Sequence, residues 1–267
     1  MSSLAALYRY PLKSAVGQSL QQSAVDGLGL LGDRRWMLVD AERGRFLTQR
    51  AVPRLTQLNT RLETDGSLVL SAAGLPDKHV PVPVLGELRG VTIWYDSLRV
   101  PDAGDAAAQW VSDFLGKPMR LVYVPVERAR TVEAGYGEDG DKLAFADGFP
   151  LLLIGQASLD DLSMRVGRPL EMARFRPNLV VQGSSAFAED GWKRIRIGDL
   201  DFRVLKPCAR CIVTTLDPQT GERSTDREPL ATLKTYRQQD GHAMFGQNLV
   251  CDGTGMLEVG MPITVLE

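Results

Sequence analysis

Two cysteines separated by two residues, Cys208 and Cys211, are the side chains in this sequence that could do redox or soft-metal chemistry. Arg210 lies between them, and a β-branched run at residues 212–215 directly follows. Because β-branched residues favour strands, we expect Cys211 to stand at the start of a strand, beside a fixed cation. A nearby cation favours the thiolate, which is the form that binds metals and attacks electrophiles.

Four interpretations of this cysteine pair compete. A thioredoxin-type pair would stand at the entrance to a helix, whereas a strand is expected here. A zinc site needs about four ligands, and the sequence adds only Cys251, His242 and carboxylates, with no second pair of this spacing. Cysteine is often simply buried, so two structural thiols are the interpretation that spacing alone favours. The fourth is one thiolate that ligates a metal carried by an organic cofactor.

Composition and charge exclude several classes of protein. The 267 residues carry 31 basic and 33 acidic side chains, so the net charge is −2, whereas a nucleic-acid surface is normally basic. No apolar run approaches the ~20 residues of a membrane span, and the N-terminus lacks the pattern of a signal peptide. Three cysteines do not make a disulfide framework. We therefore expect a cytoplasmic protein that binds neither nucleic acid nor membrane.

Short strand-like runs between turns dominate the chain, which is typical of a sheet-rich α+β protein. We expect strands near residues 4–12, 36–40, 55–62, 67–71, 91–100, 120–125, 150–154 and 178–181, and between 257 and 266. The period changes at residues 104–116 and 158–166, where apolar residues recur at helical spacing. Residues 126–141 are charged and contain glycine, which is typical of a loop.

Three separate blocks of sequence resemble a known family. They are Cys208-Ala-Arg-Cys-Ile-Val-Thr-Thr-Leu-Asp-Pro-Gln-Thr-Gly221, residues 228–237, and Phe245-Gly-Gln247. Together they resemble the core of a MOSC domain, above all in the mitochondrial amidoxime-reducing components and their bacterial counterparts. The likeness extends over nearly the whole chain. It implies an N-terminal MOSC-associated β-rich domain at residues 1–125 and a barrel-like MOSC domain at residues 126–267, with a cofactor in the cleft between them.

The resemblance also implies site residues. In the family, the second cysteine of the motif ligates molybdenum, and Cys211 is the matching position. The positions that match cofactor-facing residues are Lys13, Ser14 and Arg34 in the first half and Arg176 and Asn178 in the second. Before the strand at residues 150–154 the family has small hydroxyl residues, but this chain has Gly148 and Phe149. A cofactor contact there has to come from Asp147 or from the backbone.

The function that follows from the resemblance is a reductase with a molybdopterin-type molybdenum cofactor. Its small-molecule substrates are expected to be N-hydroxylated or N-oxide-like compounds. Three cysteines cannot supply an all-cysteine iron–sulfur site, and no dinucleotide-binding fingerprint appears. Electrons are therefore expected from a separate protein such as a ferredoxin, a cytochrome b5-like protein or a flavin reductase. The alternative is a non-redox module that carries the cofactor, or sulfur as a Cys211 persulfide.

Overall fold

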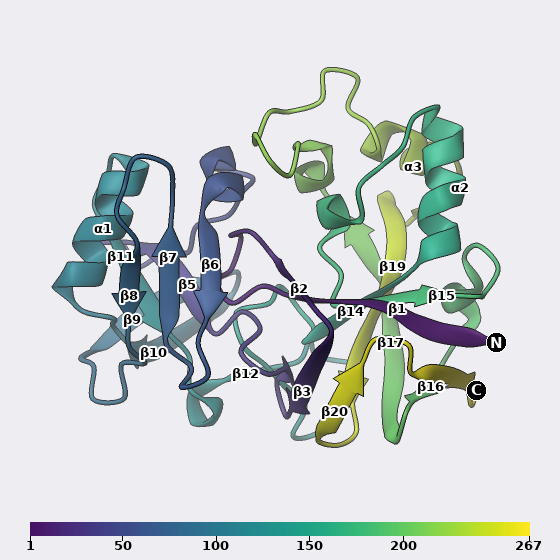
Figure 1. Cartoon of the computed structure of the whole chain (residues 1–267), viewed down its shortest axis with the longest axis horizontal. Helices are drawn as coiled ribbons and strands as arrows, with labels where there is room; N and C mark the ends of the chain where they lie inside the picture. The colour runs from purple at the N-terminus through teal and green to yellow at the C-terminus, as the bar shows by residue number, and fades with distance from the viewer.

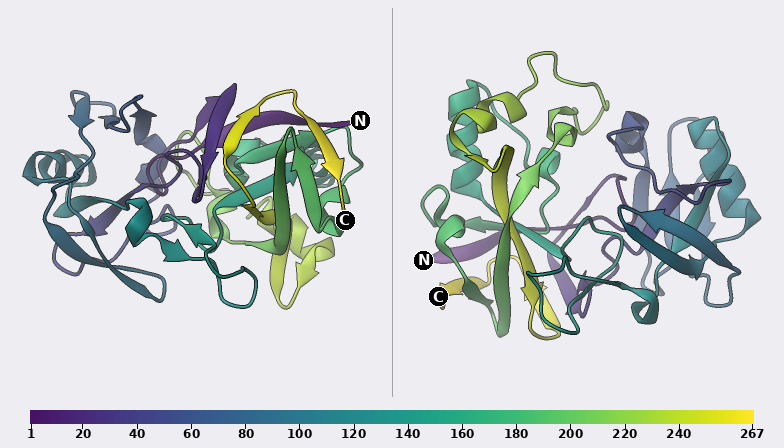
Figure 2. Two further views of the ribbon diagram at one scale, coloured as in Figure 1. Left: turned by 90° about the horizontal axis from the view of Figure 1, so that it is seen from below. Right: turned by 180° about the vertical axis from the view of Figure 1, so that it is seen from behind.

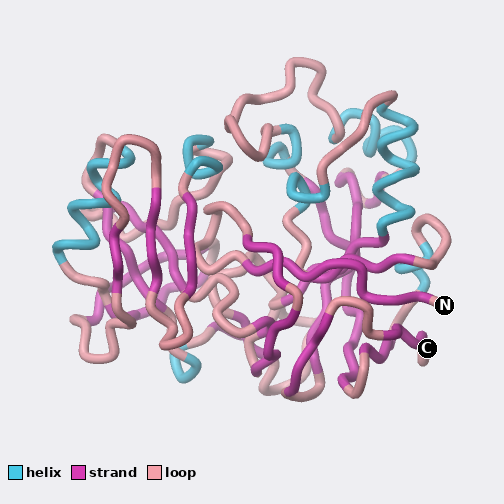
Figure 3. The backbone as a smooth tube through the Cα atoms, viewed as in Figure 1, coloured by secondary structure: helices cyan, strands magenta, loops and turns pink.

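The computed structural model describes all residues, Met1–Glu267, and its strands far outnumber its helices (Figure 3). Two lobes lie side by side in Figure 1. One holds a large sheet flanked by α2 (Gln156–Val166) and α3 (Leu230–Tyr236), and the other holds several small sheets and α1 (Asp105–Leu115). The expected sheet-rich α+β fold is confirmed.

The large sheet closes into the expected barrel because β14 pairs with both β15 and β19. In spatial order its strands are β14 (Leu151–Gly155), β15 (Leu179–Gln182), β1 (Ser2–Arg9), β21 (Pro262–Val265), β16 (Arg194–Ile197), β17 (Leu200–Arg210) and β19 (His242–Cys251). Two short strands extend it, β2 (Gln18–Leu20) beside β1 and β18 (Gln238–Gln239) beside β19. Leu7, Leu153 and Phe202 are fully buried in its core.

A second core lies outside the barrel, under α2 and α3. Leu162 of α2 and Leu233 of α3 pack there with Phe175 and Phe245. Three short 3-10 helices on this lobe are η3 (Met172–Phe175), η4 (Ala188–Gly191) and η5 (Ile212–Thr215). η3 leads into β15, and η5 directly follows β17. The segments that carry the predicted second-half residues are therefore fixed at barrel strands.

The N-terminal lobe is assembled from short antiparallel units. They are β5 (Trp36–Asp40) with β11 (Met119–Tyr123), β6 (Asn59–Leu62) with β7 (Leu68–Ser71) and β8 (Lys78–Val80), and β9 (Leu88–Ile93) with β10 (Asp96–Pro101), plus η1 (Pro53–Gln57). Trp110 and Phe114 of α1 pack against buried Trp36 and Leu121. The helical face expected at residues 104–116 is thus a core face.

The lobes are joined by more than one passage of the chain. β3 (Gln22–Asp26) pairs with β4 (Gly29–Leu30) and with β20 (Gly255–Glu258), and β12 (Arg130–Thr131) pairs with β13 (Lys142–Leu143) after η2 (Val126–Arg128). β1 lies in the barrel beside β21, so the two termini are neighbours (Figure 2). The division near residue 125 stays a prediction. No helix is both long and apolar enough to span a membrane.

Three expected elements are wrong. Residues 212–215 form a 3-10 helix instead of a strand. Residues 91–100 form a hairpin, β9 and β10, which turns at Trp94 and Tyr95. The strand expected from residue 55 begins only at Asn59, because η1 precedes it. In addition, the segment 126–141 is more ordered than an open loop, since Arg130 is buried and ion-paired with Asp96.

Candidate functional site

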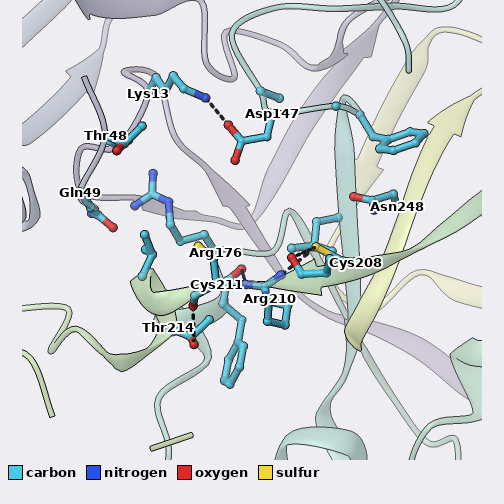
Figure 4. A pocket seen from close by; sticks show the side chains of 18 of the residues that line it. Lys13, Thr48, Gln49, Asp147, Arg176, Cys208, Arg210, Cys211, Thr214 and Asn248 are labelled. Carbon is cyan, nitrogen blue, oxygen red and sulfur yellow. Dashed lines mark hydrogen bonds and ion pairs between the residues drawn. The ribbon is translucent and has the colours of Figure 1, made fainter. Parts of the chain in front are cut away.

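One cleft is lined by all seven side chains that were predicted from the sequence to form the site. They are Lys13, Ser14, Arg34, Asp147, Arg176, Asn178 and Cys211. Its lining also includes Arg210 and five residues that the sequence did not single out: Thr48, Gln49, Arg50, Trp94 and Asn248. In Figure 4, Lys13 and Asp147 lie on one side of the cleft, across from Cys208, Arg210 and Cys211. The folded chain therefore brings the predicted residues together, although what they bind stays a prediction.

Two arginines that line the cleft, Arg34 and Arg176, flank the ring of the buried Tyr10. The guanidinium carbons of Arg34 and Arg176 lie 4.5 and 4.2 Å from the ring centroid of Tyr10. Tyr10 is fixed in turn, because its hydroxyl donates to the Pro177 carbonyl at 3.1 Å. Cation–π contacts of this kind stabilise buried guanidinium groups. Tyr10 stands three residues before Lys13, and this closeness to a predicted site residue was the available signal.

The two guanidinium groups differ in how many of their N–H donors have a hydrogen-bond acceptor. Arg34 bonds Asp33 at 2.5 Å and the Arg176 carbonyl at 3.2 Å. Burial opposes its charge, but Asp33 raises the pKa of Arg34. Arg176 donates to the Ala15 carbonyl at 2.7 Å through Nη1, while its buried Nη2 has no partner. Burial, with Arg34 nearby, lowers the pKa of Arg176 to about 10, so it is charged at neutral pH and suited to an anion.

Lys13 and Asp147 form an ion pair across the two halves of the chain. Lys13 Nζ donates to Asp147 Oδ1 at 2.5 Å and to the Phe145 carbonyl at 2.7 Å. Trp94 Nε1 donates to the same Oδ1 at 3.1 Å. Desolvation would raise the pKa of Asp147, but Lys13 and Trp94 lower it to about 2. Burial lowers the pKa of Lys13, which Asp147 partly offsets.

Asn178 serves mainly to tie the site together. Its Oδ1 accepts from Arg34 Nη1 and from the Leu152 amide, both at 3.2 Å, and its Nδ2 donates to the Tyr8 carbonyl at 3.1 Å. Only one amide hydrogen is left for a ligand. Ser14 is half-buried in a turn with φ 68°. The structure therefore places Asn178 as a support for Arg34, while a cofactor contact by either side chain stays a prediction.

The fixed cation lies beside Cys208, so its expected place beside Cys211 was wrong. Arg210 Nη1 donates to Cys208 Sγ at 3.0 Å, and Nη2 donates to the Phe175 carbonyl at 2.6 Å. Both residues belong to β17, where residues two apart point to the same face. Cys211 lies just after the end of that strand. Its Sγ makes no hydrogen bond, although the residue lines the cleft.

The β-branched run after Cys211 turns because its hydroxyls bond backwards. Thr214 Oγ1 donates to the Cys211 carbonyl at 3.0 Å, and Thr215 Oγ1 donates to the Ile212 carbonyl at 2.7 Å. Local bonds of this kind compete with the sheet ladder, and β17 ends at Arg210. Cys211 therefore occupies the N-terminal cap of η5.

Family models divide the chain in two. The MOSC N-terminal beta barrel domain matches residues 1–118, and the MOSC domain matches residues 140–264. Mitochondrial amidoxime-reducing component 1 of Homo sapiens is 35% identical over all of this chain and 83% of its own length. The chain belongs to the MOSC-domain family. Component 2 of Bos taurus is 34% identical over 96% of this chain and 81% of its own length. Molybdenum cofactor sulfurase of Oryza sativa subsp. japonica is 32% identical over 89% of this chain but only 31% of its own length.

In this MOSC protein, the two cleft cysteines are poorly placed for a disulfide. Three residues of extended chain span about 10 Å, whereas bridged cysteines need Cα atoms within about 7 Å. Both thiols are free. No group of three or more His, Cys, Asp or Glu side chains gathers in a way that could hold a metal ion. Of the four interpretations, the geometry leaves a structural thiol at Cys208 and a single available thiol at Cys211.

The MOSC motif Phe245-Gly-Gln247 has a structural role at the cleft. β17 and β19 pair Pro207 with Gln247 but Ala209 with Met244, so β19 carries one extra residue between these pairs. Gly246 lies in this bulge with φ 81°, and a Cβ there would approach Ile154 Cγ1 to 2.6 Å. Only glycine meets both conditions. The bulge sets the direction of the next side chains, among them Asn248 at the cleft.

Proposed function

We propose that this MOSC protein is a molybdenum-cofactor-dependent reductase of N-hydroxylated or N-oxide-type compounds. The observation that carries the proposal is that one cleft is lined both by Arg176, a charged guanidinium whose Nη2 lacks an acceptor, and by Cys211, a thiol that makes no hydrogen bond. An anion suits the first, and a soft metal suits the second. The whole-length similarity to amidoxime-reducing components, at 35% identity, supports the reaction class.

The residues of the cleft fit the two ends of a molybdopterin-type cofactor. Arg176 Nη2 is a buried donor without an acceptor in the protein, which is costly unless a ligand supplies one. A guanidinium fork suits the oxygens of a phosphate. Arg34 adds a second positive charge 4.5 Å from the same tyrosine ring. Across the cleft, Cys211 would give the metal a thiolate ligand, while Lys13, Ser14, Asp147 and Asn178 would complete the surroundings.

When bound, the cofactor would supply two-electron chemistry, in which an N–O bond is cleaved and two electrons and two protons release the oxygen as water. The protein orients the reactants and controls charge. Asp147 stays ionised at neutral pH because its pKa is about 2, so it accepts hydrogen bonds and does not supply the protons. Lys13 is held by Asp147 and the Phe145 carbonyl and balances that negative charge.

Electrons would come from a separate protein in a cytoplasmic setting. The three free cysteines are too few for an all-cysteine iron–sulfur cluster, so a ferredoxin, a cytochrome b5-like protein or a flavin reductase is the expected donor. The test uses purified protein whose molybdenum has been measured by elemental analysis. Reduction of benzamidoxime is followed with reduced viologen and, separately, with NADH or NADPH. We expect turnover with the viologen only. Molybdenum-loaded protein that reduces nothing with viologen would contradict the proposal.

A second candidate is a sulfur carrier with a Cys211 persulfide. It is favoured by the similarity to a molybdenum cofactor sulfurase over 89% of this chain and by the unpartnered Cys211 thiol. Cyanide-labile sulfur would distinguish the two functions. A carrier releases thiocyanate from Cys211 and not from a Cys211→Ser variant, whereas a reductase retains molybdenum and shows viologen-dependent turnover.

A further inference from the structure

Trp94 occupies a strained position at the edge of the cleft. It lies in the turn between β9 and β10 with φ 53°. A bulky residue rarely adopts positive φ, and such backbone strain costs about 1–3 kcal/mol. The indole is held by Phe46, with ring centroids 4.9 Å apart, and by Arg50, 5.4 Å from its centroid. A strained turn that is held this firmly fixes the direction of the side chain.

Trp94 also lines two adjoining hollows. The cleft continues into an outer hollow, and the two share Trp94, Asp147, Gly148, Phe149, Cys208, Ala209 and Asn248. The other charged groups of the outer hollow are already paired, Arg130 with Asp96 at 2.7 Å and Lys206 with Glu133 at 2.5 Å. What remains open to a ligand is aromatic surface and the Asp147 carboxylate.

The Asp147 carboxylate has one oxygen in use and one free. Oδ1 accepts from Lys13 and from Trp94, whereas Oδ2 accepts no hydrogen bond from the protein. The side chain is 69% exposed. In Figure 4, the second oxygen is directed into the cleft, toward the side that carries Cys208 and Cys211. A ligand with an N–H group can therefore reach this oxygen.

We propose that Trp94 and Asp147 form a substrate-specificity subsite for planar N-hydroxylated compounds that carry an N–H donor beside the N–O bond. This inference rests on the proposed reductase function. The planar group packs on the indole, and its N–H donates to Asp147 Oδ2. Trp94 holds the carboxylate through Oδ1 and thus leaves Oδ2 for the substrate. A tertiary amine N-oxide has no N–H and gains nothing from this pair.

The kinetic test compares two substrates in matched variants. Trp94→Phe keeps an aromatic ring but removes the bond to Asp147, and Asp147→Asn removes the charge. The control is Trp110→Phe, which removes an indole bond of 2.7 Å to the Pro76 carbonyl, far from the cleft. Per bound molybdenum, kcat/KM for benzamidoxime should fall about tenfold in both cleft variants, chiefly through KM. For trimethylamine N-oxide it should change less than about twofold, and the control should resemble the parent protein.

A binding measurement gives a readout that does not need turnover. Benzamidine is planar and has N–H donors, so calorimetry should show it binding about tenfold more weakly to Trp94→Phe and to Asp147→Asn. Equal kinetic losses on both substrates, or unchanged benzamidine binding, would overturn the subsite. Failure of the parent protein to reduce either substrate while it holds molybdenum would instead sink the proposed function, and benzamidine binding would still test the subsite.

Discussion

Two walls of the cleft differ in how firmly their side chains are held. The cationic wall comprises Lys13, Arg34, Asp147, Arg176 and Asn178, and the cysteine wall comprises Cys208, Arg210 and Cys211. The cationic wall is heavily cross-linked: Tyr10 lies between two guanidinium groups, and Asn178 uses both ends of its amide to hold its surroundings. The cysteine wall is a strand end and one 3-10 turn. Its Cys211 thiol has a defined place but no hydrogen-bond partner.

This difference separates the two tasks of a cofactor site. Charged groups that are fixed before binding do not need to reorganise when an anion arrives. A metal ligand needs a free lone pair, so a thiol engaged by a guanidinium is a poorer ligand than a free one. Cys208 is the engaged thiol, because its Sγ accepts a hydrogen bond from Arg210 Nη1 at 3.0 Å. Cys211 is the free thiol. The sharpest way to break the comparison is to remove each cysteine in turn.

Cys211→Ser should have the largest effect. Replacing a soft thiolate by a hydroxyl gives the metal a harder and poorer donor in place of sulfur, so we expect reductase activity to fall at least about a hundredfold, as removal of a catalytic group commonly does. Cys208→Ser should keep most activity, because it alters only the contact with Arg210. The measurements are viologen-dependent reduction and molybdenum content of both variants. Full activity in Cys211→Ser, or equal loss in both, would sink the assignment.

Arg176→Ala should have the next largest effect, on cofactor retention. A charge-assisted hydrogen bond is worth about 1.5–3 kcal/mol, which is roughly ten- to a hundredfold in affinity. The matched control is Arg194→Ala, since Arg194 pairs with Asp252 at 3.0 Å on β16, away from the cleft. Pterin fluorescence after oxidation and extensive dialysis measures what each variant retains. Equal retention in the two variants would mean that the unpartnered Nη2 does not face the cofactor.

Much of the lining of this cleft could be predicted because its residues stand in contiguous blocks that resemble those of the MOSC family. Lys13, Arg34 and Arg176 each belong to a short block that contains its own turn. The local conformation of such a block depends on its own residues and not on how the two lobes pack together. The helix expected at residues 104–116 could be predicted equally well, because the helical spacing of its apolar residues is a local pattern.

The errors have both local and long-range causes. Propensity favoured a strand after Cys211, but β17 ends at Arg210 and the threonine hydroxyls bond backwards. A run of ten residues is long for a strand, and this length was the available signal that residues 91–100 turn. Trp94 was missed as a site residue because its contact with Asp147 joins residues 53 positions apart.

Gly246→Ala tests whether the bulge supports the cysteine wall. The new Cβ would lie 2.6 Å from Ile154 Cγ1 and 2.8 Å from the Leu153 carbonyl, at φ 81°. Strain and overpacking together should cost about 2–4 kcal/mol. A lower midpoint of thermal unfolding is expected. Gly90→Ala is the control, because its Cβ would meet nothing within 4 Å. An unchanged midpoint for Gly246→Ala would show that β19 adapts without cost.

The smallest expected effect is a pH dependence at the edge of the cationic wall. The pKa of Asp147 is about 2 in the folded protein, below its ordinary value of 3.8. A carboxyl with a lowered pKa stabilises the fold above its ordinary pKa, and this contribution fades as pH falls toward the lowered value. The difference in unfolding midpoint between the parent and Asp147→Asn should therefore be constant from about pH 5 to 8 and shrink below about pH 4.

The size of this difference should be modest, because solvent reaches 69% of the Asp147 side chain. Its source can be checked in a double-mutant cycle with Lys13→Met, since contacting residues give non-additive effects. Without the Lys13 ammonium, which lies 2.5 Å from Asp147 Oδ1, Asp147→Asn should cost less and lose most of its pH dependence. If the two substitutions change the free energy of unfolding additively, the ion pair does not couple Lys13 to Asp147 energetically. Asp147 would then depend on Trp94 alone for its position.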